Sequence, residues 1–501
     1  MKNLLNFLVF TLLLLQPSGA QQTAVPKFDI EKAKQDLKIY KEIVETAHSG
    51  IYLYTSKAEF DLLFSQAKTK VSLLNSFHEF YQLLAGLHSK INCGHSSFLA
   101  SGNLFSEIKR ESESKSEKAF FPFRVKFLKD TLVADQDYGL IKKGTQILSI
   151  NGLTVADMTE EVFKLISSDG FNTTFKYRQM EEKFAIHFFS AFGASSRFEI
   201  AMIPYGKKIP QEAQLEGISI EEIDKVSYEA PFAVPYSLDY TDRNTALLTV
   251  NTFSTETQRG QKKFFKFLHH SFREMEEKNI QNLILDIRHN TGGDDGNDME
   301  LASYLIDTHF KENKFRKINS IEGMPPYVEY LSEFWFEMLD LNPNKRSKTK
   351  DHFKAMTEDD LEKGKDGAYY WKEKSIIHRD PAEYRFKGQA YVLIGGNVFS
   401  GGSLFSALVR DKSDAIFIGE ETGGGYYRHT GTIPLIYELP HSGFLFSIFM
   451  VINEQDVTQK LLPNGSGTHP HHALYPTIQE YMAGKDVVME KAKSLIKQRT
   501  P

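Results

Sequence analysis

Apolar residues in the first hundred positions recur every three or four residues, which predicts helices. The first such face comprises Leu37, Tyr40, Val44 and Ala47. Two further faces each follow a Ser and a Glu three residues apart, the pattern of a capping box at a helix start. These pairs are Ser56-x-x-Glu59 and Ser76-x-x-Glu79. The pattern predicts a helical N-terminal domain, which we place at residues 28–105.

Residues 120–205 consist of short β-rich runs separated by turn residues. An apolar strand is predicted from Ile147 to Ile150, and Asn151-Gly152 directly after it is a strong hairpin signal. A short helix is expected from Met158 to Ile166. We therefore expect a second, β-rich domain over this range.

From residue 230 to residue 498, short apolar runs alternate with amphipathic stretches, which is typical of α/β layering. Buried strands are predicted at Leu247–Val250, Leu283–Leu285 and Tyr391–Ile394, and helices at Gln261–Glu277 and Met299–Ile306. A charge-rich stretch at about 311–385 interrupts the alternation, and we interpret it as an insertion of helices and loops.

Ser400 stands at a strand-to-helix junction of this third domain. The strand Tyr391–Ile394 precedes it, and apolar residues recur at helical spacing after Gly402. A hydroxyl at such a junction can be exposed as a nucleophile, beside helix N–H groups that are free to stabilise an oxyanion. Because Ser is also a favoured helix N-cap, this segment alone leaves a purely structural role open.

The composition fits a soluble globular protein, with 41% hydrophobic and 25% charged residues. A length of 501 residues suggests about three domains. The formal net charge of −5 is small for this length, which argues against a nucleic-acid partner and against a polybasic membrane-binding surface.

The first twenty residues have the parts of a secretory signal. Lys2 supplies a positive charge, Leu4–Leu15 an apolar core too short to span a bilayer comfortably, and Ser18-Gly-Ala20 small residues before a cleavage site. We therefore expect residues 1–20 to be removed and the protein to be exported, to a periplasm or outside the cell. We expect no membrane span in the mature chain. With Cys93 as the single cysteine, no internal disulfide is possible.

A glycine-rich turn follows the strand Leu283–Leu285. Its sequence is Asp286-Ile-Arg288-His-Asn290-Thr-Gly292-Gly293. Glycines let backbone N–H groups face inward, as an oxyanion hole requires. A phosphate loop is the alternative, but no Gly-Lys-Ser/Thr follows, and Asp294 and Asp295 would repel phosphate. A metal site that adds Asp298 is also open, although the spacing is not that of an EF-hand loop.

His95 follows Gly94 just past a predicted helix, where its imidazole can be presented to a neighbouring domain. A neutral imidazole there could accept the proton of Ser400, although an isolated histidine also fits a structural role. Cys93 is interpreted as a small buried residue, because His95 alone is close enough in sequence to lower the pKa of its thiol.

Together these segments resemble the carboxy-terminal processing (tail-specific) peptidases and their tricorn-like relatives. The motifs that carry the resemblance are Asp286-x-Arg288-x-Asn290-x-Gly292-Gly293, Phe399-Ser400-Gly-Gly, Ile418-Gly-Glu420-Glu421-Thr-Gly-Gly424, Gly467-Thr-His-Pro470, Pro476-Thr-Ile478 and Gly484-Lys-Asp486. The stretch Gly144-x-x-Ile147-Leu-x-Ile150-Asn-Gly152 resembles a PDZ domain, which binds an extended peptide as an added strand. The implied fold is a multidomain α/β (α+β) arrangement: the helical domain, a PDZ-like domain at 120–205 and a crotonase/Clp-protease-like catalytic domain at 230–498.

The resemblance implies Ser400 as the nucleophile, with an oxyanion hole made by the N–H of Gly401 and one from Gly292 or Gly293. One branch of the family uses a Ser–Lys dyad, but the corresponding turn, Gly423–Tyr426, contains no Lys. The nearest, Lys412, lies in a charged run that is typical of a solvated surface.

The tricorn-like branch draws a His from a Gly-His context, which Gly94-His95 matches, so the resemblance implies His95 as general base. The orienting group is left open between a backbone carbonyl and an acid. The candidate acids are Glu420, Glu421 and Glu454.

We therefore expect an exported serine endopeptidase that acts without a cofactor on a protein or peptide bound as an extended segment. Histidines 469, 471 and 472 lack a usual zinc spacing and are interpreted as a surface loop. Two alternatives stay open. The missing Lys permits an inactive peptide-binding protein of the same fold, and the crotonase-like layering permits acyl-CoA chemistry, against which the export signal argues.

Overall fold

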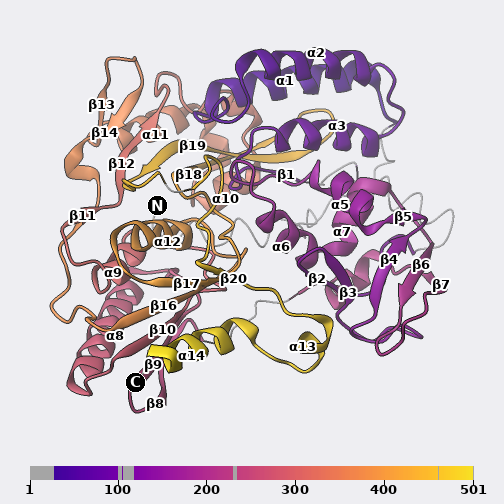
Figure 1. Cartoon of the computed structure of the whole chain (residues 1–501). Coiled ribbons are helices and arrows are strands. Elements are labelled where there is room, and N and C mark those ends of the chain that lie inside the picture. Colours follow the sequence, from indigo (N-terminus) through magenta and orange to yellow (C-terminus); the bar gives the residue numbers. More distant parts are fainter. Residues whose placement is uncertain (1–26, 100–103, 105–117, 229–233, 461, 500–501) are drawn as a thin grey trace.

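The computed structural model describes residues 27–99, 104, 118–228, 234–460 and 462–499 (Figure 1). The expected signal at residues 1–20 lies outside these ranges. Within them the chain forms three six-stranded sheets and one two-stranded sheet. The mixed, multidomain α/β fold expected from the sequence is confirmed.

The main sheet has the strand order β20-β17-β16-β10-β9-β8. Its strands are β8 Tyr236–Asp242, β9 Thr245–Val250, β10 Asn282–Asp286, β16 Gln389–Ile394, β17 Ile416–Gly419 and β20 His472–Ala473. All neighbours are parallel except β8 and β9. The three strands predicted here are therefore confirmed.

Helices cover both faces of the main sheet, because alternate residues of each strand point to opposite sides. Leu283 and Leu285 pack in one core with α8 (Gln258–Glu277), α9 (Asn297–Ser303) and α12 (Gly401–Lys412). Ile284 packs on the other side with α14 (Val487–Arg499). The short helix α13 (Ile478–Met482) precedes α14 in the chain. Burial on both faces explains why these strands are continuous apolar runs.

A second sheet is built around a long hairpin, β18 and β19. Its strands are β1 Ser97–Leu99, β12 Asn313–Ile318, β13 Leu361–Lys363, β14 Tyr369–Trp371, β18 Arg428–Glu438 and β19 Leu445–Gln455. Strand β19 pairs with β18 along one edge and with both β1 and β12 along the other. We call this the hairpin sheet; it joins the N-terminal part of the chain to the part that follows residue 234.

The stretch 311–385 differs from the helices and loops expected of it. It adds β12, β13 and β14 to the hairpin sheet, beside β11 (Phe310–Lys311), β15 (His378–Arg379), α10 (Glu333–Met338) and α11 (Thr349–Thr357). Strand β12 was missed because it is charged along its length, with the sequence Asn-Lys-Phe-Arg-Lys-Ile. Its pairing with β19 depends on residues far along the chain, which no local pattern reveals.

The N-terminal helices are α1 (Ile30–Ala47), α2 (Lys57–Val71) and α3 (Phe77–Ser89). As predicted, the Ser56 hydroxyl accepts the Glu59 N–H at 3.2 Å and the Ser76 hydroxyl accepts the Glu79 N–H at 3.1 Å. Their apolar faces share one core with β18 and β19. This region therefore packs directly on the hairpin sheet (Figure 1).

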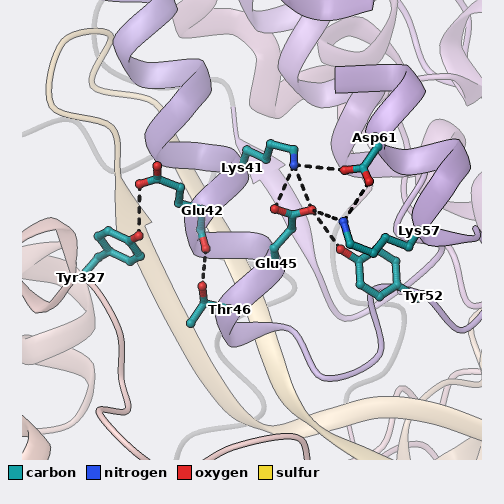
Figure 2. A network of polar contacts seen from close by, with 8 residues as sticks. All are labelled: Lys41, Glu42, Glu45, Thr46, Tyr52, Lys57, Asp61 and Tyr327. Atoms are coloured by element: carbon teal, nitrogen blue, oxygen red, sulfur yellow. Dashed lines mark hydrogen bonds and ion pairs between the residues drawn. The ribbon is translucent and has the colours of Figure 1, made fainter. Parts of the chain in front are cut away.

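Polar contacts join the N-terminal helices to each other and to the stretch 311–385 (Figure 2). The Lys41 ammonium on α1 lies 3.0 Å from Glu45 and 3.2 Å from Asp61 on α2. The Tyr327 hydroxyl donates to Glu42 at 3.1 Å. The two regions are thus in direct contact.

The third sheet has the order β2-β3-β4-β6-β7, with β5 paired to β4. Its strands are β2 Val125–Leu128, β3 Thr131–Ala134, β4 Gln146–Ile150, β5 Leu153–Thr154, β6 Arg197–Ile203 and β7 Gln211–Glu216, and its helices are α5 Val155–Phe163, α6 Thr174–Glu182 and α7 Phe184–Phe192. The turn predicted at Asn151-Gly152 joins β4 to β5, with φ of 49° and 79°. Helix α5 begins three residues before the predicted start because Thr154 caps it.

Candidate active site

Ser400 directly precedes helix α12 but does not cap it. Its side chain makes no hydrogen bond to the helix start, and its backbone adopts φ 51° and ψ −124°. Few residues other than glycine adopt a positive φ, and doing so costs about 1–3 kcal/mol. The strained backbone leaves the hydroxyl free and half-exposed at the wall of a cavity. The structural role left open for Ser400 as a helix cap is thereby excluded.

The glycine-rich turn after β10 lies against Ser400. A Cβ placed on Gly292 would lie 2.8 Å from both the Ser400 Cβ and the Gly401 nitrogen, so this position has room only for glycine. The Gly292 N–H donates to the side-chain oxygen of Asn290 at 2.9 Å. Among the described residues, no acceptor is found for the N–H of Gly293 or of Gly401. These two donors are free beside the hydroxyl.

His95 reaches the same region from the N-terminal end of the chain. Strand β1 starts two residues later and pairs with β19, with Ser97 opposite Ser447. The His95 imidazole lies 4.5 Å from the Phe399 ring and 5.3 Å from the Phe449 ring, measured between centroids. The structure therefore brings His95 against the residue next to Ser400.

The His95 imidazole is 6% exposed, and neither ring nitrogen has a hydrogen-bond partner in the described part of the chain. It is therefore not hydrogen-bonded to Ser400 in this structure. Burial, and secondarily the nearby His429, lower the pKa of His95 well below 6.5. The ring is consequently neutral at pH 7, the form that can accept a proton.

Asp169, which the sequence did not single out, holds the His95 loop in place. One carboxylate oxygen accepts the Gly94 N–H at 2.7 Å, and the other accepts the Gly425 N–H at 3.1 Å. Gly94 packs so tightly on Phe399 that an added Cβ would lie 2.8 Å from that ring. Burial raises the pKa of Asp169 to about 7. One side chain thus ties the His95 loop to the turn after β17.

His429 on β18 is a second histidine of the site that sequence reasoning missed. Its ring is stacked on that of His95, 5.4 Å between centroids, and it lines the cavity that also contains Ser400. Its Nδ1 lies 3.3 Å from the Gln455 amide nitrogen, which also donates to the Gly425 carbonyl. That amide can only donate, so Nδ1 is the acceptor and the neutral ring carries its proton on Nε2.

The candidate orienting acids have other partners. Glu421 accepts from the Asn172 amide at 3.0 Å and from the Gly467 N–H at 2.7 Å. Glu420 lies 3.8 Å from Arg178, and Glu454 pairs with Arg428 at 2.7 Å. None of the three is hydrogen-bonded to His95. The orienting role given to Glu420 or Glu421 therefore stays a prediction.

The alternative nucleophile and base are both engaged elsewhere. The charged run around Lys412 predicted a solvated side chain, and this prediction is wrong. The Lys412 ammonium lies 3.2 Å from Asp456, and the side chain is only 14% exposed. Cys93 is buried, as predicted, and burial raises the pKa of its thiol to about 12. Lys412 is paired with Asp456 and so does not replace His95 as the base. The Cys93 thiol stays protonated at pH 7 and so does not replace Ser400 as the nucleophile.

The metal alternatives gain no support from the described residues. Asp294 accepts from the Thr255 N–H and hydroxyl at 2.8 and 2.7 Å. His471 accepts the Phe417 N–H at 2.9 Å, and His469 lies 3.5 Å from Glu421. Within the described ranges, no group of three or more His, Cys, Asp or Glu side chains is arranged to hold a metal ion.

Two comparisons with known proteins agree with this geometry. Residues 244–460 match the model of peptidase family S41. The match assigns residues 244–460 to peptidase family S41. The protein is a serine-type peptidase, and the predicted resemblance to the carboxy-terminal processing peptidases is confirmed. The matched range contains the glycine-rich turn, Ser400 and the β18–β19 hairpin, whereas His95 lies before it.

Solved structures share the fold of this S41 peptidase. The structure of mature CPAF is 15% identical, with a TM-score of 0.59 over 94% of this chain and 99% of CPAF. Mature CPAF complexed with lactacystin is also 15% identical, with a TM-score of 0.60 over 94% and 98% of the two chains. No curated protein matches the sequence. At this identity the likeness concerns the fold alone, and it extends to the parts outside residues 244–460.

Proposed function

We propose that this S41 peptidase is an exported endopeptidase in which Ser400 is the nucleophile and His95 the general base. The observation that carries the proposal is the placement of two unpaired groups. An uncapped Ser400 hydroxyl stands beside free N–H donors, and a buried neutral imidazole packs on the preceding Phe399. Catalytic hydrogen bonds are often long in unliganded sites and tighten when substrate binds.

The oxyanion hole consists of the N–H groups of Gly401 and Gly293. Both lack acceptors among the described residues and flank Ser400, whereas Gly292 already donates to Asn290. The sequence left the second donor open between Gly292 and Gly293, and we now choose Gly293. Fixed donors of this kind stabilise the charge that develops on the carbonyl oxygen.

The reaction follows from these positions. The Ser400 oxygen attacks the substrate carbonyl carbon while an imidazole nitrogen of His95 accepts the hydroxyl proton. The C–N bond then breaks, and His95 returns that proton to the leaving amine. A water molecule, deprotonated by His95, attacks the ester, which releases the carboxylic acid and restores the Ser400 hydroxyl.

His95 is favoured over His429 as the base because of their different partners. The His429 Nδ1 accepts from Gln455, so its Nε2 carries a proton and donates toward the cavity. Neither ring nitrogen of His95 has a hydrogen-bond partner in the described ranges. A role for His429 as a donor toward substrate fits its place on the cavity wall.

The β-rich domain is proposed to dock an extended substrate segment in the PDZ manner. Its edge strand β7 pairs with β6, and in the described residues no strand pairs with its other edge. Such an edge can accept an added strand. Asp169 belongs to this domain and accepts the Gly94 N–H of the His95 loop, which supports a docking sheet close to the site.

Export is proposed from the N-terminal pattern of charge, apolar core and small residues. Among the described residues, no helix is both long and apolar enough to cross a membrane. Comparing the mature N-terminus in a secreted fraction with the full-length sequence tests this part. Cleavage after Ala20 is the expected result.

The experiment for the activity uses an unfolded protein such as casein, with fragments identified by mass spectrometry. Wild type and Ser413→Ala, which changes a serine at the far end of α12, should cleave internal bonds. Ser400→Ala should fold normally but cleave at least about 10³-fold more slowly. Folded wild-type protein that binds but never cleaves the substrate would instead support the inactive peptide-binding alternative.

A further inference from the structure

A cavity opens directly beside Ser400, between α9, α12, the start of β12 and the β18–β19 hairpin. The space between these elements, counted together with its part open to solvent, is about 420 Å3. Ser400, Gly401 and Gly293 form one part of its wall. The remaining wall residues are Asp294, Asp295, Asp298, Glu312, Asn313, Arg316, Leu404, His429, Thr432 and Asn453. The cavity therefore adjoins both the nucleophile and the proposed oxyanion donors.

The cavity wall carries more acidic than basic groups. Four carboxyl groups line it against one guanidinium, that of Arg316. Arg316 is already occupied, because it donates to Asn453 at 3.0 Å and to Thr432 at 2.8 Å. It also lies 4.0 Å from Asp295. Among the described residues, no salt bridge is found for Asp298 or Glu312, although Arg316 lowers the pKa of Glu312.

Three oxygen atoms of the wall have no hydrogen-bond partner among the residues that the structure describes. They are Oδ1 of Asp298, Oε2 of Glu312 and Oδ1 of Asn313, whose residues are 3%, 5% and 1% exposed. All three are acceptors, and the fully buried side-chain atoms without partners in the described chain include no donor from this wall. Buried polar atoms without partners are costly, so this set favours a bound group rich in N–H donors.

The unpaired acceptors lie within reach of a substrate residue held at Ser400. A Cβ placed on Gly401 would lie 3.6 Å from the second carboxylate oxygen of Asp298. The carbonyl carbon attacked by Ser400 is bonded to the α-carbon of the residue called P1. A P1 side chain therefore leaves the reaction centre close to Gly401 and enters this cavity.

We propose that the cavity is a specificity pocket for a lysine or arginine side chain at P1, held by Asp298, Glu312 and Asn313. The inference rests on the proposed function and names its substrate class. A guanidinium or ammonium group supplies N–H donors and positive charge to these acceptors together.

The pKa shifts of Asp298 and Glu312 agree with this assignment. Burial raises the pKa of Glu312 to about 7, and burial together with Glu312 raises the pKa of Asp298 well above 3.8. Arg316 and Arg379 lower the pKa of Glu312 but do not outweigh its burial. A cationic side chain that enters it favours their ionised forms.

The test compares peptides that differ only in the charge of P1. Arginine is paired with citrulline, its neutral isostere, and lysine with norleucine. We expect kcat/KM to be at least about 100-fold higher for the charged member of each pair, because the neutral one leaves buried groups unpaired. In Glu312→Gln and Asp298→Asn that ratio should fall toward one. Glu300→Gln, which changes an acid of α9 outside the cavity wall, should keep it.

Two contrary outcomes are distinguishable. Equal cleavage of arginine and citrulline peptides by wild type would overturn the basic specificity while leaving the peptidase assignment intact. Folded wild-type enzyme that cleaves none of these peptides and no unfolded protein would overturn the proposed function and this inference with it. The wild-type comparison decides the matter even if a pocket variant fails to fold.

Discussion

The imidazole of His95 packs on the phenyl ring of Phe399, the residue directly before Ser400, with 4.5 Å between the ring centroids. Strand β1 and the Asp169 carboxylate fix this contact from two sides. The N-terminal part of the chain therefore contacts the segment that contains Ser400.

Asp169→Asn is expected to lower kcat by about 10- to 100-fold with KM changed less than about twofold. An amide has only one acceptor, so either the Gly94 or the Gly425 N–H loses its partner and the His95 loop shifts. Misplacement of a catalytic group by about 1 Å can cost 10²-fold. Steady-state kinetics on one peptide measures the split between kcat and KM.

Asp130→Asn is the matched control, because Asp130 lies on an exposed turn of the same domain. It should behave as wild type. If Asp169→Asn kept full kcat, or altered KM alone, Asp169 would not position the base.

The pH dependence of kcat reports the protonation of His95 in the substrate complex. The pKa of His95 is held well below 6.5, so the neutral base persists as pH falls to about 6 and is lost only at lower pH. We expect His95 to cause no fall in kcat between about pH 8 and pH 6, a range in which Asp169, with a pKa raised to about 7 by burial, does titrate. The measurement is made at saturating substrate, so that pH-dependent binding of substrate to the acidic cavity does not affect kcat.

A fall in kcat centred at pH 6.5 or above that persists in Asp169→Asn would contradict a buried neutral base at His95. If the fall instead disappeared in Asp169→Asn, it would belong to Asp169, whose pKa burial raises to about 7. Comparing the pH profiles of wild type and Asp169→Asn thus separates the titration of His95 from that of Asp169.

Ser400→Gly should be more stable than Ser400→Ala by about 1 kcal/mol, although both are inactive. Glycine adopts φ 51° and ψ −124° without the steric penalty that a Cβ incurs, whereas alanine retains it. Chemical denaturation of the two variants side by side gives the difference in unfolding free energy. An alanine variant at least as stable as the glycine variant would show that the backbone at Ser400 is unstrained.

Local features of the fold were predictable from the sequence. The caps at Ser56 and Ser76, the turn at Asn151-Gly152 and the buried strands of the main sheet each depend on neighbouring residues. The Ser400 junction was found for the same reason, because a strand, a glycine turn and a helix follow one another directly.

The features that could not be predicted from the sequence are those that depend on contacts between distant parts of the chain. His429 lies in a strand with no motif of its own and joins the site only because β18 and β19 pair with each other and β1 pairs with β19. Asp169 is one acid among many until its two backbone partners are known. The charged strand β12 becomes recognisable only through its pairing with β19.

The most direct measurement of the central claim is the labelling of Ser400 by a fluorophosphonate, a probe that reacts with activated serines, followed by peptide mapping. We expect rapid labelling at Ser400 in wild type and in Ser413→Ala, slower labelling by at least about 10²-fold in His95→Gln, and a smaller effect in His429→Gln. Labelling of folded His95→Gln at the wild-type rate, or of folded wild type at no serine, would contradict the central claim.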